Sequence, residues 1–376
     1  MPSLIEVTAV TSRSDRQRFL DLPWSIYRSN PNWVPLLRMN QKAMVGYAKH
    51  PFYDVATAQT FLARRGGEVC GRISAIINPN HNHRHNDQLG FFGFFESVDD
   101  KDVAAALFDA AKAWLVERGM TTMRGPVNPS MNYECGLLVD GFDSPPTFMM
   151  TYNPPYYQRL LESYGFEKSQ DMFTFGESIE LLNVVGPKLA RVIEAAQERF
   201  RVKVRKFDKR HYQREVRMLL EMFNRGTVGS WGFVPLTNDE AKHLGNDLRF
   251  LMEPNLVRIA EVDGEPVGVL IGLLDFNPLI KQIDGRLFPF GFLRLLFGRK
   301  RLTHCRFMSA NVLPEYQRWG LGLILIGANE EYVLERGIKT GEFSWVLESN
   351  SLSLMTLKKA NMKLQKTHRL YDCSMV

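Results

Sequence analysis

Apolar and polar residues follow the same succession of patterns twice along the chain. ARRGGEVCGRISAII from Ala63 and AEVDGEPVGVLIGLL from Ala260 each contain two apolar-rich runs around a glycine-bearing turn, with Ala, Gly, Glu and Gly at identical offsets. This pattern predicts a β-hairpin in each half. Downstream, a helical pattern ends in LVERGM at 115–120 and in VLERGI at 333–338. Because Arg-Gly is typical of a helix end, a second pair of matching elements is expected.

The repeated order predicts two copies of one domain. We expect the copies at 1–180 and 201–376, with a linker helix at 181–200. Each copy alternates strands with helices, which is typical of an α/β fold with a mixed sheet covered by helices on both faces. The second copy carries an extra segment, mostly within 278–302.

Composition narrows the class of protein. A chain with 45% hydrophobic and 23% charged residues is globular rather than disordered or fibrous. It lacks an apolar run of membrane-spanning length and a signal-peptide pattern, so we expect a cytoplasmic protein, with peripheral contact at the inner membrane left open. A net charge of +6 permits an anionic partner but gives little support to nucleic-acid binding. The four cysteines are far apart and predict reduced thiols.

One loop in the second copy is a candidate anion site. The strand pattern THCRFMSANVL leads into PEYQRWGLG and then into a helix, LILIGANEEYVLER. The first amides of a helix have no partners within it and bind anions. Gly320 and Gly322 allow close backbone approach, and Gln317 and Arg318 add side-chain donors.

The longer string resembles a known loop. Val312, Pro314, Tyr316, Gln317, Arg318, Gly320 and Gly322 match the pattern of the acyl-CoA pyrophosphate loop in the GNAT (Gcn5-related N-acetyltransferase) superfamily. A strand, an Asn and a helix follow in the family's order, although Leu357 stands where a tyrosine acid often lies. The resemblance implies two tandem GNAT-like domains and acyl-CoA or acetyl-CoA as co-substrate. It implies CoA contacts at Asn311, Val312, Gln317, Arg318, Trp319, Gly320, Leu321, Gly322 and Asn350.

The first copy lacks this loop. Its strand leads directly to a helix that begins with Asp99, Asp100 and Asp102, which would repel a pyrophosphate. We expect these carboxylates to cap their own helix, and the first domain to be degenerate in CoA binding.

A further resemblance concerns the amine acceptor. The segment from Arg124 to Phe166 contains GPVNPS, GFDSPP and YNPPYY, and with the tandem layout it resembles the bacterial ceramide synthase-like (YghO-like) family. This implies acyl transfer from a thioester to a lipid amine such as a sphingoid base. Two alternatives stay open. One is acetylation of a small amine or a protein terminus, and the other is a non-catalytic protein that keeps the GNAT fold.

The reaction that forms an amide determines which catalytic groups to look for. It needs a neutral amine and a polarised carbonyl. The resemblance implies that backbone amides near 310–312 polarise the carbonyl. Glu348 is the first candidate for the base and Glu134 the second, although each also fits a surface or helix-capping carboxylate. Tyr133, Tyr152 and Asn153 are candidates for acceptor contact, with core packing as the alternative.

Two other patterns point to a metal or a membrane. His81, His83 and His85 alternate in NPNHNHRHND, which fits either a polar loop or, less often, a metal site on an extended strand. We expect the polar loop and no metal. FPFGFLRLLFGRKRL, from Phe288 to Leu302, combines four phenylalanines and several leucines with a basic flank. It fits either a buried lid helix or peripheral contact with an anionic membrane. The oligomeric state is left open.

Overall fold

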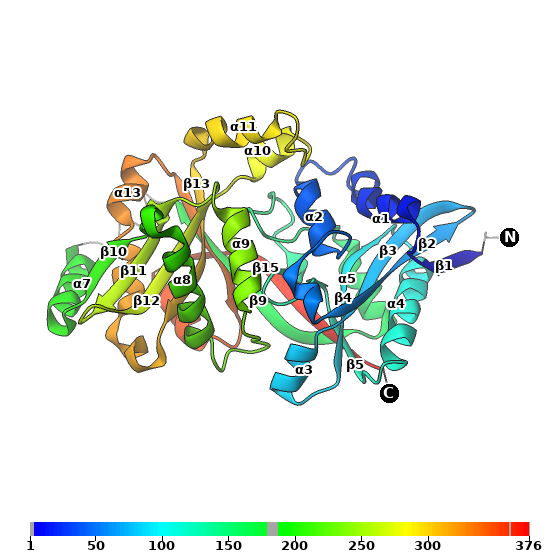
Figure 1. Ribbon diagram of the computed structural model, residues 1–376, viewed down its shortest axis with the longest axis horizontal. Helices are drawn as coiled ribbons and strands as arrows, with labels where there is room; N and C mark the ends of the chain where they lie inside the picture. The colour runs from blue at the N-terminus through cyan, green and yellow to red at the C-terminus, as the bar shows by residue number, and fades with distance from the viewer. Residues whose placement is uncertain (1–3, 179–186, 361, 376) are drawn as a thin grey trace. The chain divides into compact units, whose positions relative to one another are not determined.

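The computed structural model describes residues 4–178, 187–360 and 362–375, and the chain divides into two compact units (Figure 1). Unit 1 contains Met1–Asp171, Asn277–Arg294 and Lys366–Val376, and unit 2 contains Met172–Phe276 and Leu295–Gln365. The units are therefore not two consecutive stretches of chain. Part of the expected linker, 181–186, lies outside the described residues, and its remainder belongs to a helix of unit 2.

Unit 1 is an α/β unit whose strands follow the order β1-β2-β3-β4-β5-β15, with β8 also paired to β15. Its elements are β1 (Ile5–Ala9), α1 (Arg13–Ile26), α2 (Arg38–Met44), β2 (Thr57–Arg65), β3 (Glu68–Ile77), α3 (Pro79–His85), β4 (Leu89–Ser97), α4 (Lys101–Val116), β5 (Thr122–Gly125), β6 (Val127–Asn128), β7 (Glu134–Cys135), β8 (Leu137–Asp140), α5 (Tyr156–Tyr164), α10 (Asn277–Gln282) and most of β15 (Lys363–Ser374).

Helices cover both faces of the unit 1 sheet. Phe61 and Ala63 of β2 lie in one core with Leu107 and Phe108 of α4, and all of these side chains are buried. Leu62 stands between the two strand residues, so its side chain points to the opposite face, and it too is buried. Helix α1 packs against β3 and β4. The predicted mixed sheet with two covered faces is therefore confirmed for this unit.

Unit 2 repeats this plan with the strand order β9-β14-β13-β12-β11-β10. Its elements are the second half of β9 (Glu167–Ser178), α7 (Pro187–Phe200), β10 (Lys203–Lys206), α8 (Tyr212–Gly226), α9 (Asn238–Leu248), β11 (Val257–Val262), β12 (Glu265–Leu274), the second half of α11 (Gly291–Gly298), β13 (His304–Val312), α12 (Leu321–Gly327), α13 (Glu330–Glu335), β14 (Thr340–Leu347) and α14 (Ser351–Lys359).

Both predicted hairpins are present. Two-residue turns join β2 to β3 at Gly66-Gly67 and β11 to β12 at Asp263-Gly264. All four turn residues have positive φ angles, between 52° and 88°, as a type I′ turn requires. The predicted helix ends are confirmed as well, because Gly119 and Gly337 follow α4 and α13 in the left-handed conformation.

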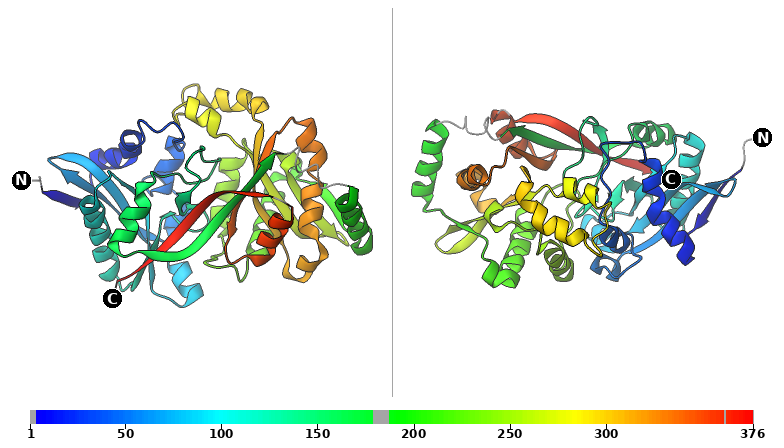
Figure 2. Two further views of the ribbon diagram at one scale, coloured as in Figure 1. Left: turned by 180° about the vertical axis from the view of Figure 1, so that it is seen from behind. Right: turned by 90° about the horizontal axis from the view of Figure 1, so that it is seen from above.

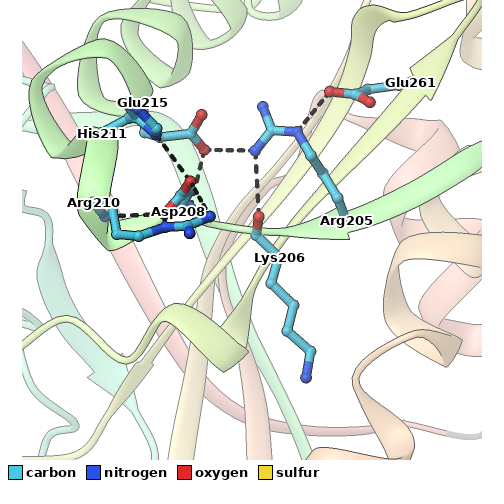
Figure 3. A network of polar contacts seen from close by, with 7 residues as sticks. All are labelled: Arg205, Lys206, Asp208, Arg210, His211, Glu215 and Glu261. Carbon is cyan, nitrogen blue, oxygen red and sulfur yellow. Dashed lines mark hydrogen bonds and ion pairs between the residues drawn. The ribbon is translucent and has the colours of Figure 1, made fainter.

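A polar network ties β10 to its neighbours in unit 2 (Figure 3). The Arg205 guanidinium donates to Glu215 of α8 at 2.7 Å and to Glu261 of β11 at 2.6 Å. Asp208 accepts from the backbone N–H of Arg210 at 2.9 Å and so begins the turn that leads into α8. The network fixes α8 against the edge of the sheet.

The halves of the chain exchange one strand each. Strand β9 follows α5 of the first half, yet it pairs with β14 of the second half, with Phe175 opposite Phe343. Strand β15 follows α14 of the second half and pairs with β5 of the first, with Asp372 opposite Arg124 (β9 and β15 are the long green and red strands in Figure 2, left). Arg124 and Asp372 also form a two-bond ion pair at 2.7 Å.

Two local predictions are wrong. The histidine run is a helix, α3, rather than a polar loop or a strand, because Asn78 caps its start through the N–H of Asn80 and Asn86 ends it in the left-handed conformation. The second half's single predicted helix is two helices, α12 and α13. The break between them coincides with Ala328, whose carbonyl accepts a 2.8 Å hydrogen bond from Arg258.

Candidate functional site

Two parallel strands part in the middle of unit 2. Strands β13 and β14 pair from His304 opposite Thr340 to Phe307 opposite Phe343, and their pairing ends there. Beside the next residue, Met308, the register between β12 and β13 shifts by one residue, as in a β-bulge. The opening therefore begins at Met308, two residues before the 310–312 stretch expected to polarise a carbonyl.

A buried polar cluster holds the strands together just before they part. Arg306 of β13 donates to the Ser344 hydroxyl at 2.7 Å, and Ser344 donates to Glu342 of β14 at 2.6 Å. His304 lies 3.6 Å from the same carboxylate. Burial alone would raise the pKa of Glu342, but His304, Ser344 and Arg306 together lower it to about 2. Sequence reasoning missed this cluster, whose only signal is a set of charged residues within apolar strands.

The predicted anion loop follows β13 directly. Asn311 and Val312 end the strand, residues 314–319 form a short 3-10 helix, and Gly320 enters α12 with φ +74°. No side chain among the described residues caps the start of α12. The first amides of this helix are therefore not taken up by a side-chain cap, as an anion site requires.

The two loop glycines leave open space. Apart from its neighbours in the chain, no atom of the described residues would lie within 4 Å of a Cβ added at Gly320 or Gly322. Packing within the protein therefore does not require glycine at position 322, and the space beside it is free for a ligand. At Gly320 the left-handed backbone is a second reason for glycine.

The loop side chains divide into exposed and packed groups. Arg318 is exposed, and the structure records no partner for its guanidinium among the described residues. Gln317 is exposed too and donates to the Val312 carbonyl at 3.4 Å. Trp319 instead stacks on Phe200 of α7, with ring centroids 4.3 Å apart. Its indole thus holds the loop in place, and Arg318 is the side chain best suited to an anion.

Glu348 and Asn350 lie just beyond the end of β14. Both are exposed, and the Asn350 side chain accepts from the N–H of Ser353 at 3.1 Å, which caps α14. Leu357 of α14 is buried. Asn350 therefore has a helix-capping role in this structure, and a CoA contact for it stays a prediction.

Unit 1 opens differently at the matching position. Strands β4 and β5 pair only as far as Phe91 opposite Arg124, and β6 then runs close beside β4. The Asn128 side chain accepts from the N–H of Phe94 at 2.7 Å, and a Cβ at Gly93 would lie 1.7 Å from the Val127 carbonyl oxygen. Asp100 caps α4 through the N–H groups of Asp102 and Val103. Asp100 thus caps its own helix as expected, and β6 lies in the opening beside β4.

A cavity of about 100 Å³ lies within unit 1 beside β4. Its lining includes Trp24, Tyr27, Trp33, Glu96, Glu134 and Tyr152. Glu96 accepts from Tyr157 at 2.7 Å and from Tyr27 at 2.9 Å, and lies 3.5 Å from Arg72. Burial raises the pKa of Glu96, although these three partners act in the opposite direction. Sequence reasoning missed Glu96, whose one signal is a single carboxylate in the apolar run LGFFGFFES.

The second candidate base, Glu134, and two of the predicted acceptor residues line this cavity. Glu134 and Tyr152 line it, and the Tyr152 hydroxyl donates to the Phe142 carbonyl at 3.2 Å. Asn153 lines it as well, but its amide bonds the N–H of Leu138 at 2.6 Å and the carbonyl of that residue at 3.1 Å. Tyr133 is buried against His50 and Phe52.

The remaining candidate chemistries involve metal ligands and thiols. Within the described ranges, no three His, Cys, Asp or Glu side chains gather as metal ligands would. All four cysteines are free thiols, and burial raises the pKa of Cys305 to about 12, which keeps this thiol protonated. Among the helices of the described residues, none is both long and apolar enough to cross a bilayer.

Known proteins resemble this chain over nearly its whole length, although no family model matches it. Protein YghO of Escherichia coli (strain K12) is 34% identical over 372 residues, which cover 97% of this chain and 94% of that protein. The bacterial ceramide synthase of Caulobacter vibrioides is 33% identical over 377 residues, covering 98% of this chain and 97% of that protein.

Solved structures share the fold at low sequence identity. A tandem GNAT protein from the clavulanic acid biosynthesis pathway superposes with a TM-score of 0.58 and 12% identity, covering 99% of each chain. A GCN5-related N-acetyltransferase from Sphaerobacter thermophilus gives a TM-score of 0.52 at 12% identity, covering 99% of this chain and 96% of the other. The tandem GNAT fold predicted from the sequence is confirmed.

Proposed function

Because the chain belongs to the family of tandem GNAT proteins that includes protein YghO and the bacterial ceramide synthase, we propose that it transfers an acyl group from a CoA thioester to a primary amine. It is an N-acyltransferase of the GNAT type. The observation that carries this proposal is the start of α12, where no side chain of the described residues caps the helix and both glycines face open space.

The donor binds through its pyrophosphate at this loop. Backbone amides of Leu321 and Gly322 and the guanidinium of Arg318 bind the phosphates, because all of them are donors beside an anion. The acyl carbonyl lies in the opening between β13 and β14. Amides between Met308 and Val312 polarise its oxygen, and the bulge supports this role because a bulge disrupts the regular ladder of hydrogen bonds.

Acyl transfer then needs one bond formed and one broken. The neutral amine attacks the thioester carbonyl, a C–N bond forms, and the C–S bond breaks with release of CoA thiolate. The amine proton passes to a carboxylate or to water, and the thiolate takes up a proton. Glu348 is our first choice for this carboxylate, because it follows β14 beside the opening, and Glu134 of unit 1 is the second.

The acceptor in this proposal is a lipid amine such as a sphingoid base. Support comes from the name of the relative that is 33% identical over nearly the whole chain. Acetylation of a small amine or a protein terminus remains the second candidate, since the loop would hold acetyl-CoA equally well.

CoA binding is tested with matched glycine variants. We expect Gly322→Glu to reduce CoA affinity at least tenfold in calorimetry, because the new carboxylate occupies the open space and repels phosphate. Gly320→Glu should do the same. Gly337→Glu is the control for Gly320→Glu. Gly337 ends α13 with a φ of +71°, close to that of Gly320, and its surroundings are equally open among the described residues. Equal CoA affinity in all four proteins, wild type included, would overturn the assignment of the loop.

The reaction itself is tested by product mass. Purified protein is incubated with palmitoyl-CoA or acetyl-CoA and with sphinganine or its 3-keto form. A long-chain amide supports the lipid acceptor, whereas product from acetyl-CoA alone supports the second candidate. CoA binding without any amide would favour the non-catalytic alternative.

The base is tested by removing one charge. We expect Glu348→Gln to lower turnover about 100-fold while CoA affinity stays unchanged, since general-base catalysis contributes on this order. Glu265→Gln, at an exposed carboxylate that begins β12, is the control and should keep full turnover. Wild-type turnover of Glu348→Gln across the pH range would assign the proton to another group.

A further inference from the structure

An exposed apolar surface lies on the segment that joins β12 to β13 (yellow helices in Figures 1 and 2). Phe288, Phe290 and Phe297 are 67%, 74% and 71% exposed, and Phe292 and Leu296 are exposed as well. We call these five residues the phenylalanine surface. Phenylalanines that expose most of their surface together mark an interaction site.

The surface is built on one side of α11. Leu296 and Phe297 follow Phe292 by four and five positions, so the three side chains lie within one arc of the helix. Leu295 lies outside this arc, points inward and is buried. The rings of Phe288 and Phe292 lie 6.1 Å apart. The helix thus has a packed side and an apolar exposed side.

The segment before α11 is firmly held. Asp284 accepts from Arg38 at 3.0 Å and from the Trp24 indole at 2.5 Å, and Asn277 donates to the Pro146 carbonyl at 2.7 Å. After the helix, Arg299 pairs with Glu253 at 2.8 Å. The phenylalanines are therefore presented by an anchored segment.

Positive charge surrounds the phenylalanine surface. Between Asn277 and Leu302 the sequence has six basic residues and one acidic residue, Asp284, which is paired with Arg38. Exposed basic side chains lie before, among and after the phenylalanines along the chain: Lys281, Arg286, Arg294, Lys300 and Arg301. A protein partner would need a complementary acidic face. An anionic bilayer offers both an apolar interior and negative phosphates.

We propose that the phenylalanine surface inserts into the interface of an anionic lipid bilayer, with the flanking lysine and arginine side chains on the lipid phosphates. The phenyl rings enter the boundary between head groups and acyl chains, and the cations remain at the phosphate level. This docking does not depend on acyl transfer, so either one can fail without the other.

Vesicle sedimentation tests the proposal with full-length protein. We expect binding to vesicles of phosphatidylcholine with phosphatidylglycerol, weaker binding to phosphatidylcholine alone, and loss of binding at high salt. The triple variant Phe288→Ser, Phe290→Ser, Phe297→Ser should bind at least tenfold more weakly, since each ring loses its apolar transfer energy. Lys300→Glu with Arg301→Glu should remove most of the preference for phosphatidylglycerol.

Phe250→Ser is the matched control, because Phe250 is 76% exposed but lies outside the segment, and it should bind like wild type. Circular dichroism checks that every variant is folded. Wild-type protein that stays in solution with phosphatidylglycerol vesicles at low salt would overturn the proposal. So would a triple variant that binds as wild type does, or one that only changes the oligomer size in light scattering, which would assign the surface to a second copy.

Discussion

Burial of one histidine, His81, lowers its pKa in the folded protein. His81 of α3 is 2% exposed, packs edge-on against Phe91, and lies 3.4 Å from Asp87. Burial, together with the nearby positive charges of His85 and Arg124, lowers the pKa of His81 to about 3. The imidazole is therefore neutral in the folded protein at pH values where an unfolded chain protonates it.

This lowered pKa predicts a loss of stability in mild acid. Below about pH 6.5 the unfolded state binds a proton that the folded state excludes, so the free energy of unfolding falls by up to about 1.4 kcal/mol per pH unit. We expect His81→Phe to flatten this dependence between pH 6.5 and 5 in urea unfolding. His83→Phe, at an exposed position of the same helix, should keep the wild-type slope. Identical slopes in all three proteins would rule out His81 as the cause.

At the scale of elements, short-range patterns were the most predictive. The hairpins and the helix ends at Gly119 and Gly337 depend on neighbouring residues, and they were predicted correctly. The helix α3 was missed because Asn and His favour loops by composition, whereas its caps at Asn78 and Asn86 decide the structure. The contact of Arg205 with Glu261 shown in Figure 3 joins residues 56 positions apart, which no local pattern marks.

The attachment of β10 to α8 depends on one arginine. We expect Arg205→Ala to lower the free energy of unfolding by about 1–3 kcal/mol, because the buried Glu215 carboxylate loses its charged donor. Arg225→Ala is the comparison on α8, since its ion pair with Glu221 is exposed and contributes less than about 1 kcal/mol. Chemical unfolding distinguishes them, and equal losses would show that Glu215 keeps adequate partners without Arg205.

At the scale of the whole molecule, the sequence predicted the tandem fold and the location of the glycine loop. Both depend on repeated or contiguous residues. It did not predict Glu96 as part of a cavity, because the partners Tyr27, Arg72 and Tyr157 come from separate elements. The sequence did not predict the partners of β9 and β15 either, because the alternating pattern of each strand would fit beside either partner.

The strand exchange also sets an order of events during synthesis. Unit 1 cannot complete its sheet until β15 has left the ribosome, although most of its residues precede Asp171. At usual elongation rates the edge of β5 waits roughly 12 to 50 s for its partner. An unpaired edge strand is a template for aggregation, so the nascent first half exposes this edge until β15 is made.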